Sequence, residues 1–114
     1  MAQGRTVLVF TRFGMGEAPA ELQQKLAGIF LNLLGQSDMA KARLVFYTDG
    51  VRLVCEGSPV LDQLKALEAQ GAELLICQTC LNYFGLADKV QVGIVGGMAD
   101  IIEALARADK VVSV

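Results

Sequence analysis

The chain has 114 residues with 10 basic and 12 acidic side chains scattered along it, giving a net charge of −2. Without a basic cluster or an aromatic and basic stripe, the chain lacks the surface expected of a nucleic-acid-binding protein. No apolar run approaches the ~20 residues of a membrane span. The length fits one domain over residues 1–114. The hydrophobic fraction of 54% leaves apolar surface to spare, which predicts a homo-oligomer.

The beginning of the chain and the cysteine count indicate a cytoplasmic protein. Residues 1–5 lead straight into a strand-like segment, without a separate apolar signal region. Three cysteines are an odd number, which argues against a secreted disulfide framework. A reducing compartment keeps such thiols available for chemistry.

The first half of the chain predicts a strand, a helix and a second strand. The apolar run at residues 6–10 is rich in β-branched residues, as expected of a strand covered on both faces. Pro19 suits the first turn of a helix, and Gly35 is placed to end that helix in a left-handed conformation. Residues 42–47 read as the second strand. The helix carries one apolar stripe, formed by Leu22, Leu26, Ile29, Phe30 and Leu33.

The second half continues this alternation. A turn at residues 48–50 precedes a short extended piece at residues 51–55. Ser58 is a good N-cap, Pro59 suits the first position of the following helix, and Gly71 closes that helix. The remaining pattern predicts strands at residues 73–77, 90–95 and 110–114, with a helix at residues 98–105 before the last strand.

This alternation of strands and helices is typical of an α/β fold with a mainly parallel sheet, here of five strands. In such a sheet the ligand site lies outside the carboxyl ends of the strands. All three cysteines fall in or beside the loops at that edge, which are residues 11–18, 48–58, 77–82 and 96–98.

A Cys-x-x-Cys pair at the end of the apolar strand 73–77 carries the most chemistry. If a helix follows, Cys77 and Cys80 lie at its positive end, where the thiolate form is favoured. Such a thiol can attack sulfur in another molecule, form a disulfide with its neighbour or carry a persulfide. Free cysteine also packs as a small hydrophobe, so burial of one or both is the alternative. Cys55 is either a third thiol in the pocket or simply tolerated in its loop.

Glycine-containing loops supply the other candidate site residues. Arg12, Gly14 and Gly16 lie between a strand and a helix, where they could cradle an anion or form a wall of the thiol pocket. Gly96 and Gly97 precede the last helix, where they could form a second nest of backbone donors or a turn with positive φ.

Several common site types lack the residues that they need. The chain has no histidine, which excludes Cys-His and Ser-His nucleophile pairs and leaves structural zinc one ligand short. We therefore expect neither a metal nor a cofactor. A thioredoxin-type oxidoreductase fits less well, because tryptophan is absent and both prolines, Pro19 and Pro59, lie upstream of the cysteines.

The cysteine segment and its surroundings resemble the DsrE/DsrF-like sulfurtransferase family. The likeness covers nearly the whole chain and is most specific around the cysteines. Within the family it is greatest to the C-terminal DsrE-like domain of selenium metabolism proteins of the YedF type. The matching segments are residues 13–16, 50–68, 71–86 and 108–111.

The resemblance implies a three-layer α/β/α fold, frequent oligomerisation and a sulfur-carrying cysteine after the third strand. In the sulfur-relay branches that cysteine precedes a glycine by eight residues, which corresponds to Cys77 and Gly85. Cys80 also has a counterpart in the branch most similar to this chain, so both cysteines stay candidates. Thr79 lies between them and is placed in the same pocket.

These observations predict a sulfurtransferase-like carrier that accepts and passes on persulfide sulfur through one of the paired cysteines. The alternatives are a non-catalytic binding or assembly module of the same fold and a thiol–disulfide redox protein. The YedF-type proteins carry an N-terminal SirA/TusA-like sulfur-carrier domain, whereas this sequence begins at the DsrE-like strand. Either a separate carrier protein is a partner, or the relay role is lost.

Overall fold

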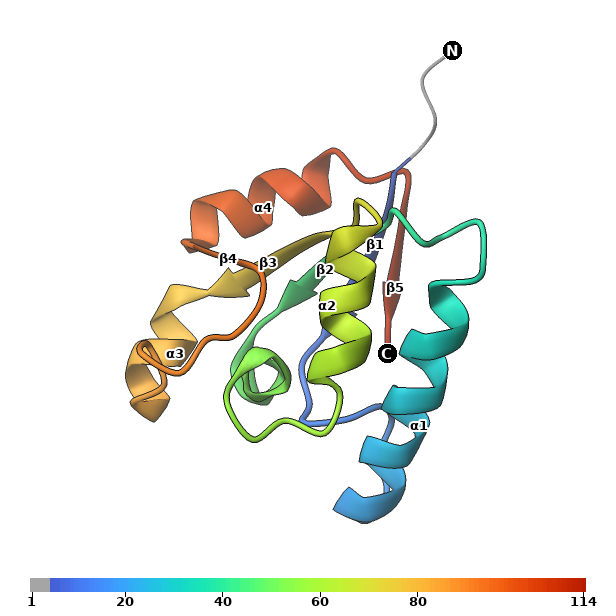
Figure 1. The fold of residues 1–114 in the computed structure, drawn as a ribbon. Coiled ribbons are helices and arrows are strands. Elements are labelled where there is room, and N and C mark those ends of the chain that lie inside the picture. Colours follow the sequence, from blue (N-terminus) through green and yellow to red (C-terminus); the bar gives the residue numbers. More distant parts are fainter. Residues whose placement is uncertain (1–4) are drawn as a thin grey trace.

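The fold is built around one parallel sheet with the strand order β4-β3-β2-β1-β5 (Figure 1). It is seen in a computed structural model that describes residues 5–114; the first four residues, part of the segment in which we expect no signal region, lie outside the described residues. Every neighbouring pair of strands is parallel, which confirms the predicted α/β fold. The strands are β1 (Thr6–Phe10), β2 (Arg43–Phe46), β3 (Glu73–Cys77), β4 (Ile94–Gly96) and β5 (Lys110–Ser113).

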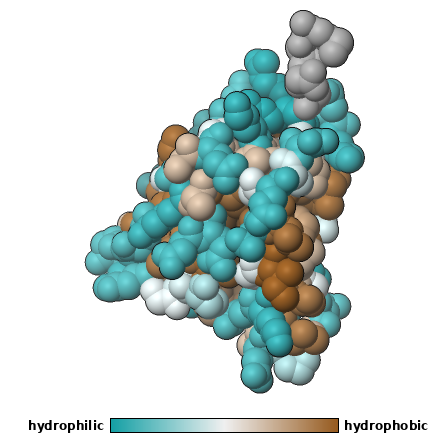
Figure 2. Space-filling model, turned by 45° about the vertical axis from the view of Figure 1, so that its right-hand side comes forward, coloured by the Kyte–Doolittle hydropathy of each residue, from teal (hydrophilic) through white to brown (hydrophobic). Residues whose placement is uncertain are grey.

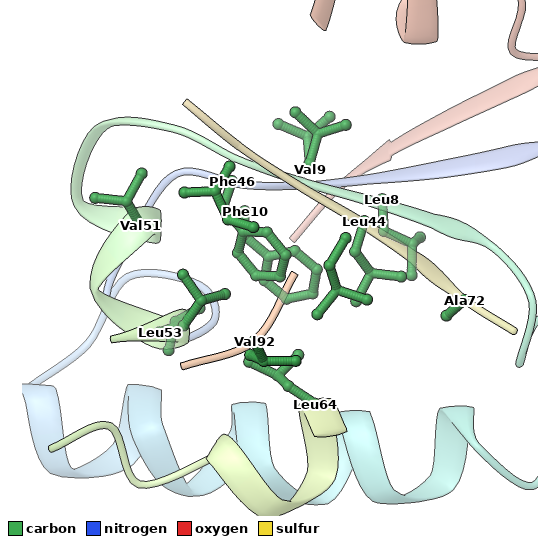
Figure 3. Close-up of a cluster of buried hydrophobic side chains, with 14 of the residues drawn as sticks. Leu8, Val9, Phe10, Leu44, Phe46, Val51, Leu53, Leu64, Ala72 and Val92 are labelled. Atoms are coloured by element: carbon green, nitrogen blue, oxygen red, sulfur yellow. The ribbon is translucent and has the colours of Figure 1, made fainter. Parts of the chain in front are cut away.

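Helices cover both faces of the sheet. Helices α1 and α2 lie side by side on one face, and α4 lies on the other (Figures 1 and 3). The short helix α3 and a 3-10 helix, η1, lie at the carboxyl edge. Their bounds are α1 (Ala20–Leu34), η1 (Thr48–Val54), α2 (Leu61–Ala69), α3 (Gln78–Phe84) and α4 (Met98–Ala106).

The core lies mainly between the sheet and the pair α1 and α2. Phe10 and Phe46 point into this layer from neighbouring strands, and their rings stack at a centroid distance of 5.0 Å (Figure 3). Val9, one residue earlier in β1, points to the opposite face, as the alternation of side chains along a strand requires (Figure 3). Both faces of β1 are therefore buried, which explains its continuous apolar run.

The apolar stripe that predicts α1 lies mostly on the outside of the molecule. Apolar atoms gather over this helix on the face drawn in Figure 2. Of the stripe, only Phe30 packs against the core. The other four side chains are between 42% and 56% exposed, and they are Leu22, Leu26, Ile29 and Leu33. Instead, a second stripe faces the core, made of Ala27, Leu31 and Leu34.

Two predicted extended segments have a different structure. Residues 51–55 belong largely to η1 and not to a strand, because Gly50 lies so close to the end of β1 that the chain turns there. Strand β4 begins at Ile94, four residues later than expected. Val90 instead forms an isolated antiparallel bridge with Cys55, so the segment just before β4 pairs outside the sheet.

The ends of the helices also differ in detail from the prediction. Gly35 ends α1 in a right-handed conformation, with φ −65°, and not in the expected left-handed one. Ser58 does not cap α2, which begins at Leu61; its hydroxyl accepts the amide of Val60 at 3.2 Å and forms a turn before the helix. Gly71 follows α2 with φ +109°, a conformation that suits glycine.

We predict that Gly50→Ala destabilises the protein strongly. A Cβ atom at this position would lie 2.0 Å from the carbonyl oxygen of Phe10, so the backbone must move. Overpacking of this kind costs about 3 kcal/mol or more. Urea denaturation followed by circular dichroism measures the change in the free energy of unfolding.

Gly28→Ala is the matched control for this substitution. Gly28 lies within α1, and its added Cβ would meet only ordinary van der Waals contacts at 3.6 and 3.8 Å. Alanine is favoured over glycine inside a helix by about 1 kcal/mol, so this variant is expected to be as stable as the parent or more stable. Equal destabilisation by both variants would contradict the role given to Gly50.

Candidate functional site

The paired cysteines lie where β3 ends and α3 begins. Cys77 is the last residue of β3 and also the N-cap of α3, while Cys80 lies in the first turn of that helix. Gly85 ends α3 in the left-handed conformation, with φ 70°. The short helix is thus fixed between a buried strand and a glycine cap, which sets the positions of both thiols.

The two thiols differ in their access to solvent. Cys77 is only 1% exposed and belongs to the core. Cys80 is partly buried, and Thr79 between them is exposed. All the cysteines are free thiols, and the Cys77 and Cys80 side chains are close enough to form a hydrogen bond. The structure therefore brings the two predicted cysteines together, with Cys77 buried in the core and Cys80 partly accessible to solvent.

Hydrogen bonds link Cys80 to residues that follow the two neighbouring strands, directly to Thr48 and through it to Thr11. The amide of Thr48, which lies just beyond β2, donates a hydrogen bond to Sγ of Cys80 at 3.1 Å. The hydroxyl of Thr48 lies 2.8 Å from the carbonyl oxygen of Thr11, the first residue beyond β1, and 2.7 Å from that of Tyr47. The sulfur is thus held at the carboxyl edge of the sheet, where α/β proteins place their sites.

The resting form of Cys80 is the neutral thiol. Burial raises the pKa of Cys80, and the hydrogen bond with Cys77 raises it further because the protonated thiol makes that bond. The amide of Thr48 acts in the opposite direction and lowers the pKa, but the net shift is upward. The sequence predicts a thiolate favoured by the helix terminus, whereas the pKa of Cys80 is shifted upward, mainly by burial.

Cys55 is a core residue. It is 2% exposed, and its thiol donates to the carbonyl oxygen of Val51 at 3.2 Å. Burial raises its pKa, and the charge of Arg52 offsets this only in part. Within residues 5–114 no three His, Cys, Asp or Glu side chains are grouped so that they could hold a metal ion.

The first loop is tied to the start of α1. Gly14, with φ +150°, packs so tightly on Gln23 that an added Cβ would lie 2.5 Å from the Cβ of Gln23. The side-chain amide of Gln23 in turn donates to the carbonyl oxygen of Gly16 at 2.6 Å. These glycines therefore position the loop itself. Beside the loop lies a hollow of about 420 Å³ lined by Arg12, Phe13, Glu17, Ala18, Gln23 and Asp49.

The second glycine pair lies beside Cys77. Gly96 is directly opposite Cys77 in the pairing of β3 with β4. Gly97, the N-cap of α4, has an ordinary φ of −92°, so it is not there for a positive φ. Its amide donates to the carboxylate of Asp100 at 2.9 Å, so this donor is already used within the protein.

Sequence reasoning misses two residues of η1 that contact α3, Thr48 and Arg52. Thr48 reads as part of an ordinary turn, yet it contacts the sulfur directly. The guanidinium carbon of Arg52 lies 4.3 Å from the centre of the Phe84 ring, one turn of helix beyond Cys80. Arg52 also pairs with Asp49 at 3.2 Å. The available signal was their position in a loop at the carboxyl edge, without any motif to mark them.

Fold and site together define a small parallel α/β protein with a thiol pair at the carboxyl end of its third strand. The chain belongs to the DsrE/DsrF-like family, whose family model matches residues 6–114. A search of curated proteins gave no match. Among the described residues, no helix is both long enough and apolar enough to cross a membrane.

Solved structures share this fold at low sequence identity. The ychN protein of E. coli is 20% identical with a TM-score of 0.72, over 98% of this chain and 100% of that one. MTH1491 of Methanobacterium thermoautotrophicum, a protein of unknown function, is 18% identical with a TM-score of 0.69, over 98% and 100%. BT1422 of Bacteroides thetaiotaomicron, also of unknown function, is 17% identical with a TM-score of 0.69, over 96% and 94%.

We predict that Cys80 is the most reactive cysteine in the native protein. Iodoacetamide is expected to label Cys80 first, and Cys77 and Cys55 only after unfolding, because both are buried. Since the pKa of Cys80 is raised, its labelling rate is low at neutral pH and keeps rising above the pH at which an ordinary cysteine is fully ionised. Peptide mapping by mass spectrometry at a series of pH values measures both.

Two controls accompany this labelling experiment. Cys80→Ser is expected to remove the label taken up by the folded protein, and labelling in urea is expected to reach all remaining cysteines. Native labelling of Cys77 as fast as that of Cys80 would contradict the difference in access.

Proposed function

We propose that the protein is a sulfurtransferase-like carrier that accepts persulfide sulfur on Cys80 and passes it to an acceptor. The observation that carries the proposal is the contrast within the pair: Cys80 reaches the surface and is held by an amide, while Cys77 is buried behind it. Membership of the DsrE/DsrF-like family supports a sulfur-relay role for this fold.

In the loading step the thiolate of Cys80 attacks the outer sulfur of a donor persulfide. A sulfur–sulfur bond forms on Cys80, the donor's sulfur–sulfur bond breaks, and the donor leaves as a thiolate. Delivery is the same displacement in reverse. An acceptor thiolate attacks the outer sulfur and Cys80 is released as a thiolate, so neither step needs an oxidant or a reductant.

Cys77 offers a second outcome for the loaded protein. Its thiol lies beside Cys80 and can attack the inner sulfur of the persulfide. That step forms a Cys77–Cys80 disulfide and releases the outer sulfur as sulfide, with the proton of Cys77 leaving alongside. Burial of Cys77 slows this side reaction and so favours transfer over loss.

The resemblance to YedF-type proteins suggests a partner and a setting for this activity. We propose a separate SirA/TusA-like carrier as donor or acceptor, and selenium as a second cargo, because selenium at this oxidation level undergoes the same displacements. A reducing compartment such as the cytoplasm keeps the three thiols free for this chemistry.

Incubation with a small-molecule persulfide is expected to add one sulfur, about 32 Da, to Cys80. The adduct is expected in the parent and in Cys77→Ser, and to be absent in Cys80→Ser. It should also last longer in Cys77→Ser, because the disulfide-forming release of sulfide is then blocked. Intact-mass spectrometry over time and a sulfide probe measure the two effects.

Cys55→Ser is the matched control, since it removes a thiol that plays no part in the proposed transfer. It is expected to load like the parent. No adduct on any cysteine would overturn the carrier proposal, and an adduct on Cys77 in Cys80→Ser would overturn the choice of Cys80.

A second candidate function, assembly, is favoured by the exposed stripe on α1. Its four side chains are spaced by four, three and four residues, the spacing at which two helices pack along a common seam. The stripe therefore suits the same helix of a second copy of the chain. Such pairing is the form that we propose for the homo-oligomer predicted from composition.

Leu26→Glu is expected to lower the mass of the particle in solution. Light scattering on the parent should give a multiple of 12.2 kDa, and the variant should move toward a single chain, because a charge would be buried in the seam. Lys65→Glu on α2 adds negative charge at another exposed position and is expected to leave the mass unchanged. A parent of 12.2 kDa at high concentration would contradict self-association.

A further inference from the structure

The conformation of Thr48 is unusual for its residue type. Among residues 5–114 it is the one residue other than glycine with a positive φ, at 50°. This left-handed region is unfavourable for a β-branched side chain. Such a residue persists only where its surroundings hold it, and residues of this kind concentrate at functional sites.

Contacts on both sides hold Thr48 in place. Its hydroxyl lies within hydrogen-bond distance of the carbonyl oxygens of Thr11 and Tyr47. Before it, the amide of Tyr47 donates to the carbonyl oxygen of Phe10 at 3.1 Å. After it, Gly50 approaches that same carbonyl so closely that no side chain fits between them. The segment is therefore clamped against the end of β1.

The result of this conformation is the direction of one N–H group. The amide of Thr48 points across the carboxyl edge to Sγ of Cys80, at 3.1 Å. That sulfur has a second polar neighbour in Cys77, which favours the protonated thiol. The two contacts therefore act on the same sulfur in opposite directions: the amide favours the charged form, and Cys77 favours the neutral one.

We propose that Thr48 is the residue that selects Cys80 as the sulfur-bearing thiol, because its hydroxyl locks the backbone so that its amide holds the reacting sulfur. The inference rests on the proposed carrier function. The amide donates to the thiolate that attacks the donor persulfide, and again to the thiolate released when the acceptor takes the outer sulfur. Hydrogen bonds to a charged acceptor are the stronger ones, so the contact tightens in both transition states.

Two substitutions of Thr48 separate the hydroxyl from the backbone conformation. Thr48→Val keeps the shape but removes the hydroxyl, so the backbone is expected to leave the left-handed region and the amide to leave the sulfur. The thiolate fraction of Cys80 at neutral pH is then expected to fall about three- to tenfold. Thr48→Gly keeps the amide and tolerates positive φ, so we expect it to stay within about twofold of the parent. Iodoacetamide labelling of Cys80 across pH measures both.

Cys77→Ala is the opposing control. It removes the contact that favours the neutral thiol, so the labelling midpoint of Cys80 is expected to move down in pH, whereas Thr48→Val moves it up. A purely structural role for Thr48 would alter the stability of both Thr48 variants and leave the midpoint in place. An unchanged midpoint in folded Thr48→Val would overturn the proposal.

A measurement on the unsubstituted chain keeps the test decisive if Thr48→Val does not fold. The amide proton of Thr48, followed by nitrogen–proton correlation NMR, is expected to shift downfield as Cys80 ionises and to stay unmoved in Cys80→Ser. An amide that does not respond to ionisation would overturn the contact. Neither readout uses a persulfide, so failure of sulfur loading and failure of the Thr48 contact are distinguishable.

Discussion

The close approach of η1 to the end of β1 is the constraint on which the site depends. The carbonyl of Phe10 leaves no room for a side chain at position 50, so only glycine lets the chain turn there. That turn places Thr48 between the ends of β1 and β2, where its amide reaches Cys80 beyond β3. Thr48 thus links the ends of β1 and β2 to the sulfur that follows β3, through its hydroxyl and its amide and not through charged side chains.

The electrostatics of the pair follow from the same packing. Cys77 is buried in the core as the last residue of β3, whereas Cys80 lies in the first turn of α3 and is partly exposed. Partial burial keeps Cys80 neutral at rest, and among residues 5–114 the amide of Thr48 is the contact that lowers its pKa. Cys80 is therefore a neutral thiol at rest and not a permanently charged nucleophile.

The sequence alone is sufficient to predict the sheet and the location of the thiol pair. Continuous apolar runs mark the buried strands, and parallel strands end at a common edge. It does not predict which side of a helix is buried where the helix carries two apolar stripes. Helix α1 carries two apolar stripes, and periodicity identifies the helix without deciding which stripe meets the sheet. The conformation of Thr48 could not be predicted, because positive φ in turns is mostly adopted by glycine and asparagine. Threonine adopts it here because tertiary contacts with the end of β1 hold it.

The raised pKa of Cys80 also bears on the choice between sulfur transfer and disulfide exchange. A thiol of higher pKa is the stronger nucleophile once ionised and the poorer leaving group. In the proposed carrier role Cys80 therefore holds its sulfur once loaded, because transfer requires Cys80 itself to leave. In the same proposal the Thr48 amide offsets this retention by stabilising the departing thiolate. A redox protein gains nothing from such retention, since its disulfide must open in every cycle; a carrier needs sulfur that stays until the acceptor arrives.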